Sequence, residues 1–279
     1  MTRFQPTIAA AFLGLALLIL VPAPSAAQEP RPFEPVPGQA GKDVVWVPTP
    51  ESLVEKMLDM ATVTARDVVM DLGSGDGRNV IAAARRGARA VGVEYNPEMV
   101  ALSRRNAEKA GVAGRATFIE GDMFAADISE ATVLALFLLP SNLEKLKDKF
   151  LALRPGTRIV LNTFGIEGWE PDATETVGGD CESWCTSLLL MVPARVDGPW
   201  RMAGGEVVFA QAFQKLTGSL KTRDGAATIT EGRLRGEAIE FMADGTRYTG
   251  RVEGDRMEGT AVTASGASRR WNARRTGAR

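Results

Sequence analysis

The fold is decided by residues 68–78, which read VVMDLGSGDGR. An apolar run ends near the acid Asp71, three alternating glycines follow, and a helical pattern begins after them. This order is typical of a buried strand that turns sharply onto a helix. Glycine tolerates positive φ and lets the backbone approach a ligand that a Cβ atom would push away. The stretch therefore predicts a ligand site at the end of a strand.

The residues around these glycines narrow the class of ligand. A dinucleotide-binding loop favours Gly or Ala at the sixth position of its motif, where this chain has Arg78. Asp71 stands at the strand end, where its carboxylate repels a pyrophosphate. NAD is therefore disfavoured, and a cationic or zwitterionic ligand such as S-adenosylmethionine is favoured.

Two further acids follow the next two predicted strands. Residues 90–94 (AVGVE) end in Glu94, which is placed to accept hydrogen bonds from both hydroxyls of a ribose. Residues 116–120 (ATFIE) lead to Asp122, which is placed to accept from an adenine amino group, with Met123 beside the ring. Each acid alone also has a simpler explanation as a polar cap on a loop. Three acids in register at one sheet edge favour a binding site.

These motifs resemble the seven-strand, Rossmann-like methyltransferases that use S-adenosylmethionine. The likeness is closest to a protein-lysine methyltransferase family, whose mitochondrial members modify the ATP-synthase c subunit and the adenine nucleotide carrier. It rests on WVPTP at residues 46–50, DLGSGDGR at 71–78 and IAAA at 81–84, and it covers about residues 44–200. The resemblance implies that the following residues bind the cofactor: Thr49, Asp71, Gly73, Ser74, Gly75, Glu94, Tyr95, Asp122 and Met123.

The acceptor site is predicted after the fourth strand, residues 132–140 (TVLALFLLP). This strand lacks the Asn-Pro-Pro-Tyr or Asp-Pro-Pro-Tyr signature of amide and adenine amino methyltransferases, which disfavours those substrates without excluding them. The resemblance to the lysine methyltransferase family implies a protein lysine as acceptor. An apolar pocket lowers the pKa of a lysine amine and so favours its reactive form. Phe137 to Pro140 are predicted to form the walls of this pocket. Ser141 or Asn142 is predicted to accept a hydrogen bond from the amine. Phe137, Pro140 and Asn142 are thus the predicted catalytic residues, although the same stretch could simply end a core strand.

Strands and helices alternate along residues 44–200, the predicted methyltransferase domain. Helices are expected over residues 51–61, 79–86, 97–110 and 142–153, the first of them capped by Thr49 or folded over the cofactor. This alternation predicts an α/β fold, a Rossmann-like seven-strand, mostly parallel sheet with helices on both faces. Residues 201–275 are rich in glycine and short alternating stretches, which predict a small antiparallel β module. That module either recognises a protein substrate or covers the sheet edge, and residues 276–279 are a tail.

Residues 1–27 have the composition of a secretory signal peptide, with Arg3 before an apolar run over residues 8–21 and small residues before Gln28. An uncleaved membrane anchor over residues 8–21 is the alternative, although the run is short for a span. Residues 28–43 are expected to be a linker. The expected location is periplasmic, where S-adenosylmethionine is not expected to be plentiful. A second function therefore stays open, an exported non-catalytic nucleoside- or small-molecule-binding protein with a methyltransferase-like fold.

Composition narrows the function further. The chain has 33 Lys and Arg against 34 Asp and Glu, so nothing indicates a nucleic-acid surface, and the basic residues from Arg269 onward are interpreted as a solvated tail. Histidine is absent, which removes the commonest general base and the commonest zinc ligand, and no metal is expected. Cys181 and Cys185 flank Trp184 and leave three alternatives open: a disulfide, free thiols or a metal site. The oligomeric state is not indicated.

Overall fold

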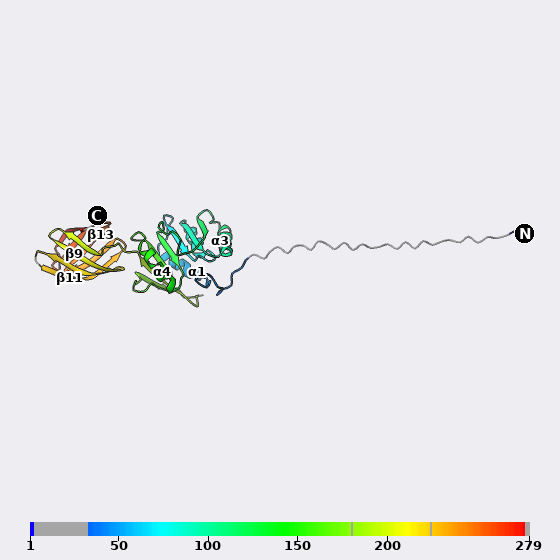
Figure 1. The fold of residues 1–279 in the computed structure, drawn as a ribbon, viewed down its shortest axis with the longest axis horizontal. Coiled ribbons are helices and arrows are strands. Elements are labelled where there is room, and N and C mark those ends of the chain that lie inside the picture. Colours follow the sequence, from blue (N-terminus) through cyan, green and yellow to red (C-terminus); the bar gives the residue numbers. More distant parts are fainter. Residues whose placement is uncertain (3–32, 180, 224, 277–279) are drawn as a thin grey trace. The chain divides into compact units, whose positions relative to one another are not determined.

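The computed structural model describes residues 1–2, 33–179, 181–223 and 225–276 (Figure 1). The compact unit runs from Phe33 to Arg279. The predicted signal peptide with its cleavage before Gln28, and the alternative anchor over residues 8–21, lie almost entirely outside the described residues and stay predictions. Within the described part of the chain, no helix combines the length and the apolar character that crossing a membrane requires.

Seven strands form the first sheet, in the spatial order β3-β2-β1-β4-β5-β7-β6. β1 to β5 run parallel, and β6 and β7 form an antiparallel edge. The chain builds outward from β1 to β3 and then returns to place β4 beside β1. Such a reversal opens a crevice at the carboxyl ends of the strands. The strands are β1 (Val68–Leu72), β2 (Arg89–Glu94), β3 (Ala116–Glu120), β4 (Val133–Leu136), β5 (Arg158–Asn162), β6 (Ala173–Thr176) and β7 (Thr186–Met191).

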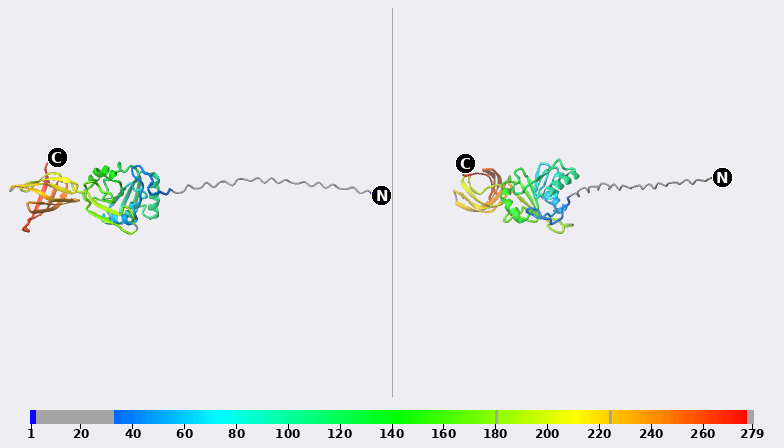
Figure 2. Two further views of the ribbon diagram at one scale, coloured as in Figure 1. Left: turned by 90° about the horizontal axis from the view of Figure 1, so that it is seen from below. Right: turned by 45° about the vertical axis from the view of Figure 1, so that its right-hand side comes forward.

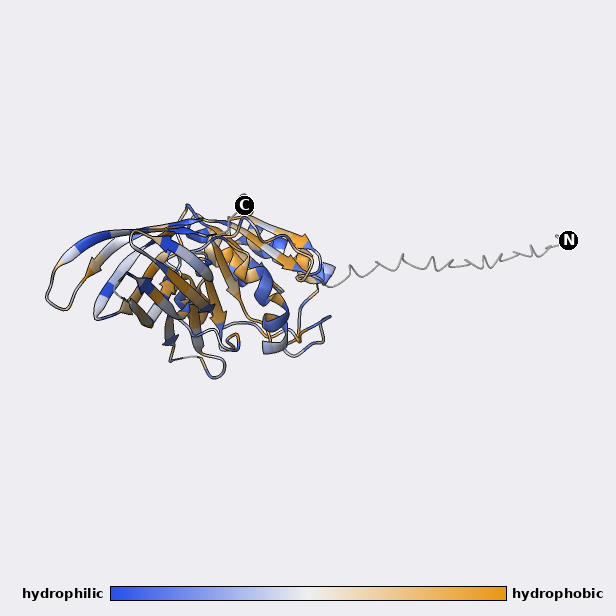
Figure 3. Ribbon diagram, turned by 60° about the vertical axis from the view of Figure 1, so that its left-hand side comes forward, coloured by the Kyte–Doolittle hydropathy of each residue, from blue (hydrophilic) through white to orange (hydrophobic). Residues whose placement is uncertain are grey.

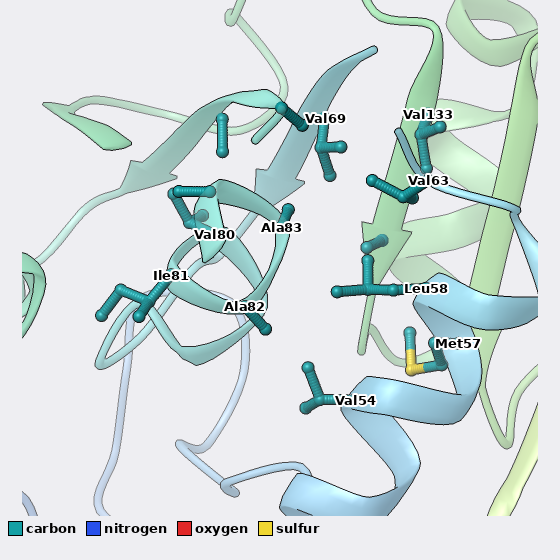
Figure 4. Close-up of a cluster of buried hydrophobic side chains, with 14 of the residues drawn as sticks. Val54, Met57, Leu58, Val63, Val69, Val80, Ile81, Ala82, Ala83 and Val133 are labelled. Carbon is teal, nitrogen blue, oxygen red and sulfur yellow. The ribbon is translucent and has the colours of Figure 1, made fainter. Parts of the chain in front are cut away.

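Helices cover both faces of this sheet. They are α1 (Glu51–Met60), α2 (Arg78–Arg85), α3 (Pro97–Lys109) and α4 (Pro140–Leu151). Successive strand residues point to opposite faces. Val69 and Val133 accordingly pack in the cluster that includes α1, α2 and α3, while Met70 and Leu134 pack in the cluster that includes α4. Figure 4 shows part of the first cluster, with α1 and α2 meeting over the strands. The predicted α/β fold class is confirmed.

The cap of α1 and the start of α4 differ from the sequence prediction. Pro50, not Thr49, occupies the N-cap position of α1, and no side chain caps that helix. The hydroxyl of Thr49 instead accepts a hydrogen bond from Asn162 Nδ2 at 3.3 Å. α4 begins at Pro140, two residues earlier than expected, because proline is well suited to the first turn. Asn142 therefore lies in the first turn of a helix and is buried.

The predicted antiparallel module is a closed barrel of eight strands, which Figure 2 shows from two sides. Trp200 was predicted to end the first domain, but it lies in the first barrel strand. This strand pairs with the last strand, where Trp200 is opposite Arg275, and the pairing closes the barrel. Arg269 to Arg275 thus belong to a strand and not to a tail. The strands are β8 (Gly198–Met202), β9 (Gly205–Ala212), β10 (Lys215–Thr222), β11 (Gly225–Arg235), β12 (Ala238–Ala243), β13 (Thr246–Glu253), β14 (Arg256–Val262) and β15 (Ser268–Arg275).

Aromatic side chains fill the interior of the barrel. Phe241 stacks on Tyr248 with ring centroids 4.7 Å apart and meets Phe209 and Trp271 edge-on at 5.3 and 5.9 Å. Offset stacked and edge-to-face arrangements are the favoured geometries for such rings. The buried apolar side chains of the barrel strands form one cluster, which includes these four rings. Figure 3 shows hydrophobic residues, in orange, on strands and on helices. The barrel interior is therefore a packed core.

Candidate active site

The glycine loop between β1 and α2 forms the floor of a cavity at the carboxyl ends of the parallel strands. Gly73, Gly75 and Gly77 have φ values of +75°, +54° and +84°, which L side chains rarely adopt. A Cβ atom at Gly75 would lie 2.7 Å from the indole nitrogen of Trp46. The loop is fixed to the end of β2, because Gly73 N–H donates to the Val93 carbonyl at 2.8 Å. Glycine is required here for both conformation and space.

Asp71 is the buried acid of the site and is 3% exposed. Its carboxylate accepts one hydrogen bond from Asn79 Nδ2 at 3.1 Å. Burial raises the pKa of the Asp71 carboxyl well above its ordinary value, and the nearby charges of Glu94 and Asp76 raise it further, while the Asn79 hydrogen bond acts the other way. A cationic ligand would offset this unfavourable environment, which is what the sequence predicted for this acid.

Two buried polar atoms in the cavity lining have no hydrogen-bond partner among the described residues. They are Ser74 Oγ and Asn79 Oδ1, on side chains that are each 4% exposed. Leaving a buried polar atom unpaired costs about 1–3 kcal/mol. Both side chains line the same cavity as Asp71, and Asn79 also donates to Asp71, so a polar ligand in the cavity could complete these hydrogen bonds.

The second and third acids are already engaged. Glu94 accepts from the backbone N–H groups of Gly75 and Asn96 at 3.0 and 2.9 Å. Asp122 accepts from Lys42 Nζ at 2.6 Å, and this hydrogen bond is the main reason why the pKa of the Asp122 carboxyl is lowered. Lys42 also lies over the Tyr95 ring, 4.7 Å from its centroid. A lysine of the chain itself thus contacts the predicted adenine acceptor.

Lys42 belongs to a strap, residues 39–49, that borders the cavity. An isolated bridge joins Ala40 to Val45, and Arg78 Nη1 donates to the Thr49 carbonyl at 2.6 Å. Residues 39–43 belong to the predicted linker 28–43, and in the structure they line the cavity. Thr49, a predicted cofactor residue, also lines the cavity at the end of the strap.

All nine predicted cofactor residues line this one cavity: Thr49, Asp71, Gly73, Ser74, Gly75, Glu94, Tyr95, Asp122 and Met123. Their individual contacts with the cofactor stay predictions.

The predicted catalytic residues divide into two groups. Phe137 lines the cavity together with Leu138 and Leu139. Pro140 and Asn142 do not, because α4 starts at Pro140 and turns the Asn142 side chain inward. Asn142 Nδ2 donates to the Asp43 carbonyl at 3.4 Å, so it supports the strap. Its predicted contact with an acceptor amine stays a prediction.

Sequence reasoning missed two aromatic residues and most of the strap. Phe164 and Trp184 line the cavity near Phe137 but come from segments after β5 and before β7. The WVPTP stretch at residues 46–50 was the sequence feature that could have indicated that the strap borders the cavity. Cys181 and Cys185 were the signal for Trp184, and they form a disulfide in the structure, which selects one of the three alternatives.

Comparison with known proteins identifies the family. A family model described as "ANTKMT methyltransferase domain" matches residues 71–173. A protein-lysine N-methyltransferase from Saccharolobus islandicus (strain REY15A) is 50% identical over 131 residues, which cover 46% of this chain and 81% of that protein. The chain belongs to the ANTKMT methyltransferase family.

Two further similarities help to interpret this methyltransferase. The adenine nucleotide translocase lysine N-methyltransferase of Mus musculus is 39% identical over 114 residues, which cover 40% of this chain and 50% of the mouse protein. A crystal structure titled RNA methyltransferase from Salinibacter ruber, in complex with S-adenosyl-L-homocysteine, is 48% identical with a TM-score of 0.50. It covers 54% of this chain and 96% of that chain. The cofactor of this methyltransferase is S-adenosylmethionine, as predicted, and the unpaired Ser74 and Asn79 atoms and the glycine loop fit it.

Proposed function

We propose that this methyltransferase N-methylates a lysine side chain of a protein. The observation that carries the proposal is the position of Leu138 against the glycine loop: a Cβ atom at Gly73 would lie 3.5 Å from Leu138 Cδ2. Leu138 is 2% exposed, and Phe137 and Leu139 continue the apolar wall. The loop that holds the methionine part thus directly faces an apolar acceptor site.

This wall suits an amine acceptor. When bound, S-adenosylmethionine supplies an electrophilic methyl group, whose bond to sulfur breaks as its bond to the acceptor nitrogen forms. The apolar wall removes water from the amine and lowers its pKa, so that the proton passes to solvent before transfer. Phe137, Leu138 and Leu139 then hold the neutral nitrogen in line, and alignment supplies most of the rate enhancement.

The names of the relatives support this choice of acceptor without being unanimous. The archaeal and mouse relatives are lysine N-methyltransferases, whereas the Salinibacter ruber structure is titled an RNA methyltransferase. The test is to incubate the full chain with methyl-tritiated S-adenosylmethionine and separate protein and RNA fractions of a cell extract. We expect label that protease releases and that acid hydrolysis returns as methylated lysine. Label that ribonuclease alone releases would contradict the proposal, and Asp71→Asn serves as the low-activity control.

We also propose that the chain works outside the cytoplasm, as its first residues predict. The Cys181–Cys185 disulfide supports this location, because such bonds persist in oxidising compartments and are rare in the cytoplasm. Rapid alkylation of intact cells followed by mass spectrometry measures the state of the pair. An oxidised pair is expected, and two alkylated thiols would contradict the proposed location.

A further inference from the structure

Three aromatic rings gather in the part of the cavity that lies beyond the glycine loop. Phe137 follows β4, Phe164 follows β5 and Trp184 precedes β7. The Phe137 ring lies 6.3 Å from the Phe164 ring and 6.0 Å from the Trp184 ring, measured between centroids. All three line the same cavity as Asp71 and Leu138. They come from three separate segments of the chain, so the sheet edge assembles them.

The backbone around these rings is held in rarely adopted conformations. Trp184 has φ +56° and Thr163, which precedes Phe164, has φ +59°. Bulky and β-branched residues seldom adopt positive φ, and such residues cluster at functional sites. Thr163 N–H donates to the Thr186 carbonyl at 2.7 Å, which ties the Phe164 segment to β7. The fold thus constrains the two segments that present the rings.

A disulfide closes the loop that carries Trp184. It joins Cys181 to Cys185, and Val177 N–H donates to the Cys185 carbonyl at 2.9 Å, so the loop is fixed to the end of the β6–β7 pair. Trp184 is 45% exposed despite its size, whereas Leu138 deeper in the cavity is 2% exposed. Trp184 therefore meets solvent at the entrance, and the apolar wall lies within.

We propose that Phe137, Phe164 and Trp184 bind the ammonium group of the acceptor lysine and of its methylated products, and that the disulfide positions Trp184 for this task. The proposal rests on the proposed function and specifies how the acceptor is recognised. Aromatic faces attract cations, tryptophan most strongly, and quaternary ammonium groups are bound by such clusters. A charged amine is met first at Trp184 and loses its proton deeper, against the buried Leu138. A methylated amine, which is charged again, is retained at the rings for a further transfer.

The proposal predicts a preference for positive charge that depends on Trp184. The probe is Nα-acetyl-Nε-trimethyl-lysine methylamide, compared with the analogue in which carbon replaces the quaternary nitrogen. Both are titrated by NMR into the full chain saturated with S-adenosylhomocysteine. The charged probe should bind roughly five- to thirtyfold more tightly in the wild type. Trp184→Ala should lower this ratio several-fold, Trp184→Phe should lower it less, and Val262→Ala, which shortens an exposed side chain of the barrel, should keep all of it.

A second arm tests the disulfide. The Cys181→Ser/Cys185→Ser double variant, and the wild type treated with a phosphine reductant, should lose several-fold of the charged-probe affinity. Neither should change the affinity for S-adenosylhomocysteine, and the reductant should not affect the double variant. Unchanged probe affinity in both would overturn the role of the disulfide.

Failure of this inference is distinguishable from failure of the proposed function. Equal charge preference in Trp184→Ala and wild type, with normal S-adenosylhomocysteine binding, overturns the inference even if protein lysine is labelled. Label confined to RNA overturns the proposed function whatever the probes do. If Trp184→Ala does not fold, as loss of S-adenosylhomocysteine binding would reveal, Trp184→Phe and the double variant decide the result.

Discussion

The sheet domain and the barrel both bury large apolar side chains, but among the described residues only the sheet domain buries acidic residues, Asp67 and Asp71. The barrel interior is built on stacked and edge-on rings such as Phe241 and Tyr248. The sheet domain buries Asp71, Ser74 and Asn79 in the lining of one cavity, and Ser74 and Asn79 each have an unpaired polar atom. Buried polar groups without partners destabilise a fold. Other unpaired buried atoms, such as Gln214 Oε1 between β9 and β10, lie outside this cavity. At the cavity, however, the unpaired atoms belong to a lining that also holds the buried acid Asp71, and none of the described residues lining it comes from the barrel strands.

The largest expected effect breaks the barrel while sparing the cavity. Phe241→Ala removes a fully buried ring that contacts three other aromatic residues, and such changes cost about 3–5 kcal/mol. We expect a lower midpoint of denaturation, measured by tryptophan fluorescence in urea. The affinity for S-adenosylhomocysteine, measured where the variant is still folded, should be unchanged. A parallel loss of affinity would show that the barrel contributes to the cavity.

Asp71→Asn should have the opposite effects to Phe241→Ala: it should weaken cofactor binding without lowering stability. It keeps an oxygen to accept from Asn79 but removes the charge that attracts the cationic cofactor, and hydrogen bonds to charged groups are worth about 1.5–3 kcal/mol. We expect S-adenosylmethionine to bind roughly ten- to a hundredfold more weakly in calorimetry. The free energy of unfolding without cofactor should rise, because the buried acid is gone. Weaker binding together with lower stability would contradict this account of Asp71.

The raised pKa of Asp71 also gives a pH dependence with a definite sign. Because burial raises the folded-state pKa above the ordinary 3.8, the unfolded chain ionises first. This contribution to stability is fully present below the unfolded pKa and is lost as pH rises through the folded pKa. Cofactor affinity should increase over the same interval, since the cation binds the ionised form. Both slopes should be reduced in Asp71→Asn, which urea titrations and calorimetry at several pH values can measure.

Much of the cofactor end of the cavity could be predicted from sequence, because its signal is local. Asp71 and the glycines adjoin a strand, and Glu94 and Asp122 repeat that position on the next strands. The strap, Phe164 and Trp184 reach the cavity from elsewhere in the chain, so no local pattern reveals them. A shift of two residues in the start of α4 was enough to misplace Asn142. Closure of the barrel depends on pairing Trp200 with Arg275, which periodicity cannot indicate.

A glycine pair sharpens the comparison between the two regions. Gly75 has φ +54° beneath Trp46, while Gly254 in the barrel has φ +58° and a Cβ atom added there would meet no described atom within 4 Å. Alanine at either position carries a backbone strain of about 1–3 kcal/mol. Only Gly75→Ala should also displace Trp46 and weaken S-adenosylmethionine binding, on the order of tenfold. Equal affinity in the two variants would mean that the loop tolerates a side chain.

The smallest expected effect concerns the strap. Lys42→Ala removes an exposed ion pair with Asp122 and a positive charge near a cationic ligand. It should therefore tighten S-adenosylmethionine binding by about two- to fivefold, the size typical of an exposed pair. Raising the salt concentration should reduce the difference from the wild type. Weaker binding in Lys42→Ala would show that Lys42 helps to hold the cofactor.

The most direct test of the cofactor site is a calorimetric titration of S-adenosylmethionine into the full chain, the Asp71→Asn variant and the Val262→Ala control. We expect micromolar binding to the wild type and the control, and much weaker binding to Asp71→Asn. Equal binding to all three proteins, or no heat with the wild type, would contradict the claim that the strand-end cavity is the cofactor site.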